Sequence, residues 1–104
     1  MIIVHGRAEF DPSQLEALRP ALQEMMRRTF EESGCLSYSL AIEDEGGEGR
    51  PAVLTIAERW SSEADLVSHD ASPHMTAFRN AVAGALWSVD LKMFDATNER
   101  PLTL

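Results

Sequence analysis

Residues 36–60 read LSYSLAIEDEGGEGRPAVLTIAERW, and their pattern decides the fold. Apolar side chains occupy every second position of the first half: Leu36, Tyr38, Leu40 and Ile42. Small or hydroxyl side chains stand between them, which predicts a strand with one buried face. Residues 43–51 hold three glycines and a proline, so we expect a hairpin loop there, followed by a returning strand over Ala52–Trp60.

The segment before this hairpin predicts a strand and a long helix. Residues 2–10 alternate apolar and polar side chains, with Ile3 as the exception. Asp11 and Pro12 are typical of a helix start, because aspartate caps free backbone N–H groups and proline fits the first turn. Apolar and small side chains then recur at helical steps, towards an end near Ser33–Gly34: Leu15, Leu18, Leu22, Met25, Met26 and Thr29. We expect Pro20 to bend this helix.

Two short helices and a strand are predicted after the hairpin. Ser61 or Ser62 can cap a helix that extends to about Ala71, and Ser72–Pro73 repeats the signal of a capped start. The second helix has an apolar stripe: Met75, Phe78, Val82, Ala85 and Leu86. Residues 87–96 predict a last strand with one apolar face: Trp87, Val89, Leu91 and Met93. Residues 97–104 are expected to be a short tail.

The predicted order of elements is β-α-β-β-α-α-β within one domain, residues 1–104. An antiparallel sheet with its helices on one face, which is the ferredoxin-like α+β arrangement, is the simplest fold for this order. The chain's own helices then leave the other face of the sheet uncovered. We therefore expect a second copy of the chain to close that face in a homodimer.

Composition and charge exclude several classes of function. The chain has 104 residues and a formal net charge of −8, which repels phosphate backbones, so we expect no nucleic-acid partner. No apolar run approaches the roughly 20 residues that a membrane helix needs, so no membrane insertion is predicted. The single cysteine, Cys35, excludes an internal disulfide and a multi-cysteine metal site. A cytoplasmic protein with no signal peptide is the simplest prediction.

Four short motifs give the chain a family resemblance. They are Gly-Cys-Leu-Ser-Tyr at residues 34–38, Glu-x-Trp at 58–60, Asp-Leu-x-x-His at 65–69, and Ser-Pro-His followed by a phenylalanine at 72–78. With this order of strands and helices, they resemble the antibiotic biosynthesis monooxygenase (ABM) family, which includes small quinol monooxygenases. The detailed match covers roughly residues 34–80.

The resemblance implies a ferredoxin-like protomer that pairs through its sheet into a dimeric α+β barrel. It also implies a cavity between sheet and helices, where some family members oxygenate quinols or phenols without metal, flavin or haem. A related branch binds and degrades haem with an asparagine on the first strand. Residues 2–10 contain no asparagine, which argues against haem degradation.

Three residues are candidates for acid–base chemistry. Glu58 has the strand parity of Trp60, so it points with the apolar face and must be paired or have a raised pKa. It could act as an acid or base or orient a histidine, or it could be a bonded group at the dimer interface. His69 is the preferred base, with a helix-end histidine bonded to backbone as the alternative. His74 is the second candidate base, unless it is simply solvated in the first turn of its helix.

Three aromatic residues are candidates for the walls of a substrate pocket. Trp60 could line a site for a small aromatic molecule, with its indole N–H as a polar handle, or it could be core. Tyr38 and Phe78 fit the core equally well, with pocket lining as a second role. Metal binding is not predicted, because the five-residue step from His69 to His74 crosses a helix break and no cysteine cluster is near.

The resemblance and these residues together therefore imply a cofactor-independent monooxygenase that oxidises a quinol, or a phenolic or polycyclic aromatic substrate, with O2. The alternative is a non-catalytic dimeric protein of the same fold that binds a small ligand or regulates a partner. Haem binding is a third and weaker option.

Overall fold

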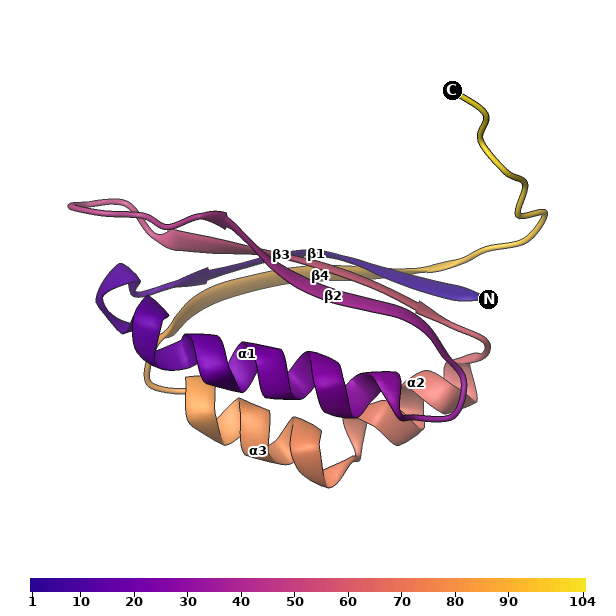
Figure 1. The fold of residues 1–104 in the computed structure, drawn as a ribbon, viewed down its shortest axis with the longest axis horizontal. Helices are drawn as coiled ribbons and strands as arrows, with labels where there is room; N and C mark the ends of the chain where they lie inside the picture. Colours follow the sequence, from indigo (N-terminus) through magenta and orange to yellow (C-terminus); the bar gives the residue numbers. More distant parts are fainter.

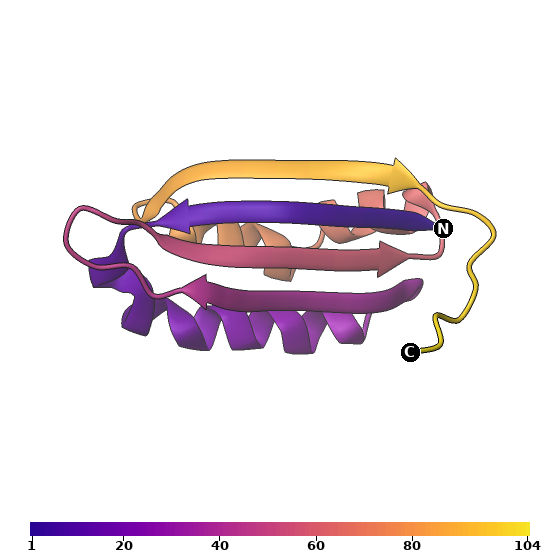
Figure 2. The same cartoon turned by 90° about the horizontal axis from the view of Figure 1, so that it is seen from above.

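The predicted hairpin forms one side of a four-stranded antiparallel sheet that carries all the helices on one face (Figure 1). The computed structural model describes residues 1–104. The elements follow the predicted order: β1 (Ile2–Phe10), a 3-10 turn (Pro12–Gln14), α1 (Leu15–Phe30), β2 (Cys35–Asp44), β3 (Ala52–Trp60), α2 (Glu63–Asp70), α3 (Pro73–Val82) and β4 (Leu86–Asp95). The strands lie in the order β2-β3-β1-β4 (Figure 2), so the ferredoxin-like α+β fold class is confirmed.

The helix starts lie where the capping residues predicted them. The Asp11 carboxylate accepts a hydrogen bond from the Ser13 backbone N–H at 2.9 Å, ahead of the 3-10 turn. Ser62 and Ser72 cap α2 and α3, each through its hydroxyl oxygen. These bonds satisfy backbone donors that the first turn of a helix leaves free. The long helix α1 runs through Pro20 without a break.

The predicted end of α1 near Ser33–Gly34 is wrong. The helix ends at Phe30, and the next two backbone N–H groups bond three residues back, to the carbonyls of Arg28 and Thr29. This tighter winding leads to position 34, where φ is +83°, a backbone conformation that favours glycine. The turn carries Glu32 out of the helix and over α2, which matters for the site below.

Two predictions of strand alternation fail at irregular pairings. The register between β2 and β3 shifts between Cys35 and Ser37, which leaves Leu36 as an extra residue that is 51% exposed. The register between β1 and β4 shifts likewise, which leaves Trp87 outside the apolar row of β4. Such bulges add one unpaired residue and reset the alternation of faces. Ala85 and Leu86 likewise fall outside α3, since the helix ends at Val82 before a turn.

The helix-facing side of the sheet forms continuous rows across the strands. In one row Tyr38 of β2 lies opposite Glu58 of β3, which lies opposite Val4 of β1, which lies opposite Met93 of β4. Helix α1 packs against β2, and α2 against β3. At the far edge the helix-facing side of β4 is largely open, so its apolar side chains stay 41–49% exposed: Val89, Leu91 and Met93.

The core lies between the sheet and α1. The largest of the fully buried side chains are Trp60, Met25 and Thr29. None of the three helices is long and apolar enough to cross a membrane.

Candidate active site

His69 lies at the centre of a buried group of rings and carboxylates. It occupies the last turn of α2, and only 2% of it is exposed. Its ring centre is 4.8 Å from that of Trp60 and 5.3 Å from that of Tyr38. Its Nδ1 lies 2.6 Å from Oε2 of Glu32, a hydrogen bond that joins residues 37 positions apart. The partner of this helix-end histidine is therefore a carboxylate rather than a backbone carbonyl.

Glu32 is the site residue that the sequence did not predict. It lies in the turn after α1, where no helical or strand periodicity marks it. Gly34 permits this turn: a Cβ there would lie 2.2 Å from the Asp65 carboxylate. No lysine or arginine pairs with Glu32, and the side chains that approach its carboxylate are the two histidines. The only signal in the sequence was its place two residues before Gly34, the glycine of the turn after α1.

His74 approaches the same carboxylate from the other side. It lies in the first turn of α3, and its Nε2 is 3.5 Å from Oε2 of Glu32. That nitrogen is fully buried and has no hydrogen-bond partner, although the side chain is 21% exposed. The structure thus brings both predicted histidines together around one carboxylate, with their ring centres 6.0 Å apart.

Glu58 faces the interior, as its strand parity predicted. It is 7% exposed, and its Oε1 accepts a hydrogen bond from the indole N–H of Trp60 at 2.9 Å. Burial raises the pKa of the Glu58 carboxyl, while the Trp60 N–H and the nearby His69 act in the opposite direction. Its observed partner therefore belongs to its own protomer, and the raised pKa means that its carboxyl keeps a proton to higher pH than that of an exposed glutamate.

A cavity of about 420 Å³ lies between the sheet and α3. Twelve of its fifteen lining residues are apolar, and the polar ones are Glu58, Asp70 and Arg79. An adjoining cavity of about 240 Å³ is lined by His69 and shares Glu58 and Asp70 with the first. Apolar walls with a few convergent polar groups are typical of small-molecule sites. Asp70 and Arg79 were not predicted, and they pair with each other at 3.0 Å.

The three predicted aromatic residues take different places. Tyr38 and Phe78 line the larger cavity. Burial, and next the charge of Glu58, raise the pKa of the Tyr38 hydroxyl, so this phenol stays protonated. Trp60 is completely buried and lines neither cavity, so it supports Glu58 and His69 from behind. Its role in substrate binding stays a prediction.

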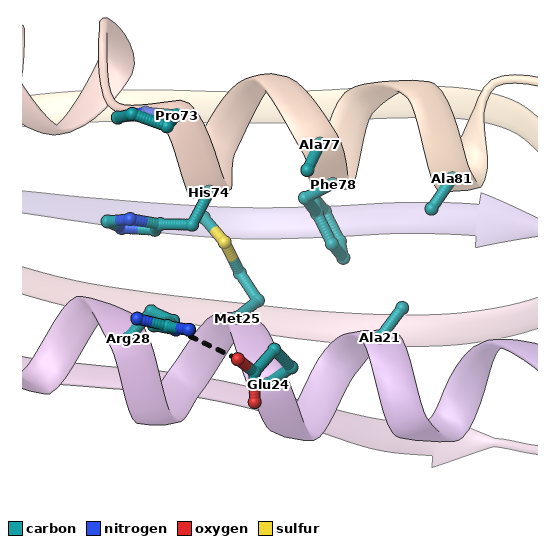
Figure 3. A pocket seen from close by; sticks show the side chains of 9 residues that line it. All are labelled: Ala21, Glu24, Met25, Arg28, Pro73, His74, Ala77, Phe78 and Ala81. Atoms are coloured by element: carbon teal, nitrogen blue, oxygen red, sulfur yellow. Dashed lines mark hydrogen bonds and ion pairs between the residues drawn. The ribbon is translucent and has the colours of Figure 1, made fainter.

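A larger groove of about 570 Å³ runs between α1 and α3 (Figure 3). Its width comes from three alanines: Ala21, Ala77 and Ala81. An exposed ion pair lies on its α1 side, where Arg28 Nε is 2.9 Å from Glu24 Oε1. His74 also lines this groove, so the groove gives one face of the histidine pair access to solvent.

The arrangement suits proton transfer next to an apolar site. A carboxylate that accepts the Nδ1–H of an imidazole fixes its tautomer and leaves Nε2 as the basic nitrogen. Glu32 holds Nδ1 of His69 in this way, while the His69 ring lines a cavity. The same three groups, Glu32, His69 and His74, also have the chemistry of metal ligands.

Comparison with known proteins gives a consistent result. The model of the antibiotic biosynthesis monooxygenase family matches residues 1–81. Rv0793 of Mycobacterium tuberculosis, provisionally named a monooxygenase, is 37% identical over 75 residues, which are 72% of this chain and 69% of the relative. YgiN of Escherichia coli, provisionally named a quinol monooxygenase, is 24% identical over 82 residues, 75% of this chain and 79% of the relative.

Solved structures show the same fold over nearly the whole chain. The structure of Rv0793 superposes with a TM-score of 0.76 at 31% identity, covering 96% of this chain and 98% of that one. A structure from Deinococcus radiodurans, provisionally assigned to the same family, gives a TM-score of 0.82 at 22% identity and covers 99% of each chain. The second likeness concerns the fold alone.

Proposed function

Because this chain belongs to the antibiotic biosynthesis monooxygenase family, we propose that it oxidises a quinol or a related electron-rich phenol with O2. The reaction as proposed uses no redox cofactor. One observation carries the proposal: the His69 ring, held through Nδ1 by Glu32, lines a cavity that shares lining residues with the larger apolar cavity. The quinol monooxygenase name of a relative supports the class of substrate.

The proposed first step is removal of a phenolic proton. A quinol in the apolar cavity places one hydroxyl near His69, whose Nε2 takes the proton, while Glu32 stabilises the imidazolium that forms. The resulting anion is a much better electron donor than the neutral quinol. Once the open side of the cavity is closed, its apolar walls would keep water away from this anion, and a poorly solvated anion gives an electron to O2 more readily.

The proposed oxygen chemistry balances without another reductant. The anion transfers one electron to O2, and the semiquinone and superoxide that result combine through a new C–O bond at a ring carbon. Breakage of the O–O bond then releases one oxygen as water, and the other remains on the ring as a hydroxyl or keto group. The quinol supplies both electrons and both protons of the water, and a hydroxyquinone is the product.

Glu58 and Arg79 are proposed to orient the substrate. Both line the larger cavity, at which Glu58 offers a carboxyl oxygen and Arg79 an N–H donor. A second hydroxyl of the quinol can donate to Glu58, whose other oxygen is held by Trp60. Trp60 would thus act on the substrate indirectly, by fixing the carboxyl that touches it.

A homodimer is proposed to complete the cavity. Val89 and Leu91 of β4 line the larger cavity, yet they remain 49% and 41% exposed in the single chain. This row lies on the helix-facing side of the sheet, so a second copy that buries it must pack around the β4 edge, and not only over the helix-free face that the sequence predicted. Such a copy would close the cavity on that side. Apolar rows of this kind on an edge strand are otherwise an aggregation hazard.

Binding without turnover is the second candidate function. It is favoured by one observation, since the completely buried Trp60 contributes nothing to the cavity walls. A protein of this kind would bind a small aromatic molecule and leave O2 untouched.

The test is O2 uptake by metal-free protein with a panel of quinols and polyphenols, with anaerobic samples as controls. Uptake above the uncatalysed rate with at least one quinol, together with one oxygen atom from labelled O2 in the product, supports the proposal. Saturable quinol binding with no uptake above background would contradict it and favour the binding role.

A further inference from the structure

Three side chains with metal-binding chemistry converge from three separate segments of the chain. Glu32 comes from the turn after α1, His69 from the end of α2 and His74 from the start of α3. We propose that they form a binding site for a divalent transition-metal ion such as Zn²⁺, through Glu32 Oε2, His69 Nδ1 and His74 Nε2. This site does not depend on the proposed monooxygenase activity.

The positions of the three ligand atoms are close to those that a metal requires. Zinc bound at about 2.0–2.1 Å in tetrahedral geometry separates its ligand atoms by about 3.3 Å. Glu32 Oε2 lies 3.5 Å from His74 Nε2 and 2.6 Å from His69 Nδ1. All three atoms lie within 4.8 Å of one another. Movements of roughly 1.5 Å or less, which side-chain rotation supplies, would therefore complete the geometry.

The buried Nε2 of His74 points independently to a ligand. It is shielded from solvent and has no hydrogen-bond partner, and the Glu32 carboxylate lies 3.5 Å away. Leaving such a group unsatisfied costs free energy, so a buried polar atom without a partner calls for a bound water or ion. A metal ion between His74 and Glu32 would satisfy it.

Charge also favours a cation at this position. Glu32 has no lysine or arginine partner, so no side chain of fixed positive charge offsets its carboxylate. The whole chain carries a formal charge of −8, which adds to the attraction. His74 and Glu32 are 21% and 18% exposed, so an ion can enter from the side of the α1–α3 groove.

The ligand set selects a class of metal. Two imidazoles and one carboxylate suit zinc and other first-row transition ions, whereas Mg²⁺ and Ca²⁺ prefer oxygen ligands throughout. Three protein ligands leave the fourth position to water. A metal on Nδ1 of His69 obliges Nε2 to carry the proton. The metal-bound histidine could not then act as the proposed base, so the ion would be an inhibitor of that reaction.

The test is a Zn²⁺ titration of the full chain after removal of metals with EDTA and exchange into chelator-free buffer. Calorimetry should give one Zn²⁺ per chain with a Kd below about 10 µM. Imidazole ¹⁵N spectra should show shifts at His69 Nδ1 and His74 Nε2, and none at His5, an exposed histidine on the opposite face of the sheet. Because these spectra use the unaltered chain, they hold even where a variant fails to fold.

Matched variants assign the ligands. His74→Gln and Glu32→Gln should each weaken Zn²⁺ binding at least tenfold, whereas His5→Gln and Glu31→Gln should leave it unchanged. Mg²⁺ in millimolar excess should not displace the zinc. The proposal is overturned if no saturable Zn²⁺ binding occurs, if His5→Gln abolishes it, or if the His69 and His74 resonances do not move.

Discussion

The hydrogen bond between Glu32 and His69 should contribute measurably to stability. Its 2.6 Å distance and the 3% and 18% exposure of the two side chains mark a buried, charge-assisted contact. Bonds of this kind contribute about 1.5–3 kcal/mol, whereas exposed ion pairs contribute about 0.2–1 kcal/mol. Glu32→Gln should therefore lower the free energy of unfolding by about 1.5–3 kcal/mol. Each kcal/mol lost should lower Tm by roughly 4–8 °C.

A double-mutant cycle isolates this contact from the cavity that loss of the imidazole creates. Glu32→Gln, His69→Gln and the double variant are unfolded in urea with EDTA present and at one protein concentration, since metal and dimerisation would both add stability. Glu31→Gln is the matched control, because this neighbour is 64% exposed and should change stability by less than about 0.5 kcal/mol. A coupling energy below about 0.5 kcal/mol would refute the interpretation of a buried, oriented imidazole.

Three further predictions concern Glu58, Trp60 and β4. Burial raises the folded-state pKa of Glu58, so the wild type loses stability as pH rises through that pKa. In urea unfolding, the free energy of unfolding of Glu58→Gln should therefore rise relative to that of the wild type between pH 4 and pH 8. A difference between the two proteins that does not change with pH would disprove this. Trp60→Phe removes the N–H donor of the ionised Glu58, so its cost should be larger at pH 8 than at pH 4; an equal cost at both would show that only packing is lost. Leu91→Lys should convert the dimer to a monomer in light scattering, whereas Leu102→Lys in the tail should leave the dimer intact. A monomeric wild type would rule out closure of the cavity by a second copy.

Local patterns were sufficient to predict the fold but only part of the site. Ser62 and Ser72 act through backbone groups a few residues away, so their capping roles can be predicted from the sequence alone. Glu58 was assigned to the interior from strand parity, which is also a local property. The irregular pairings at Leu36 and Trp87 depend on the partner strand, and no pattern within their own strands marks them.

Glu32 shows why the rest of the site was not predictable. Its contact with His69 spans 37 residues and depends on the tight turn that follows Phe30. The spacing of His69 and His74 along the chain argued against a shared metal site, because helix α2 ends between them. In space the break between α2 and α3 turns both rings towards one carboxylate. The helical repeat applies only within one helix, so it could not predict this arrangement.

The central claim is that His69 removes a proton from a phenolic substrate in this cavity. The most direct measurement compares initial rates of O2 uptake by metal-free wild type, His69→Gln and His5→Gln at saturating quinol. A positioned general base contributes about 10²–10⁴-fold, so His69→Gln should lose at least about a hundredfold in rate while His5→Gln retains the wild-type rate. A His69→Gln variant that folds normally and oxidises quinol at the wild-type rate would contradict the account.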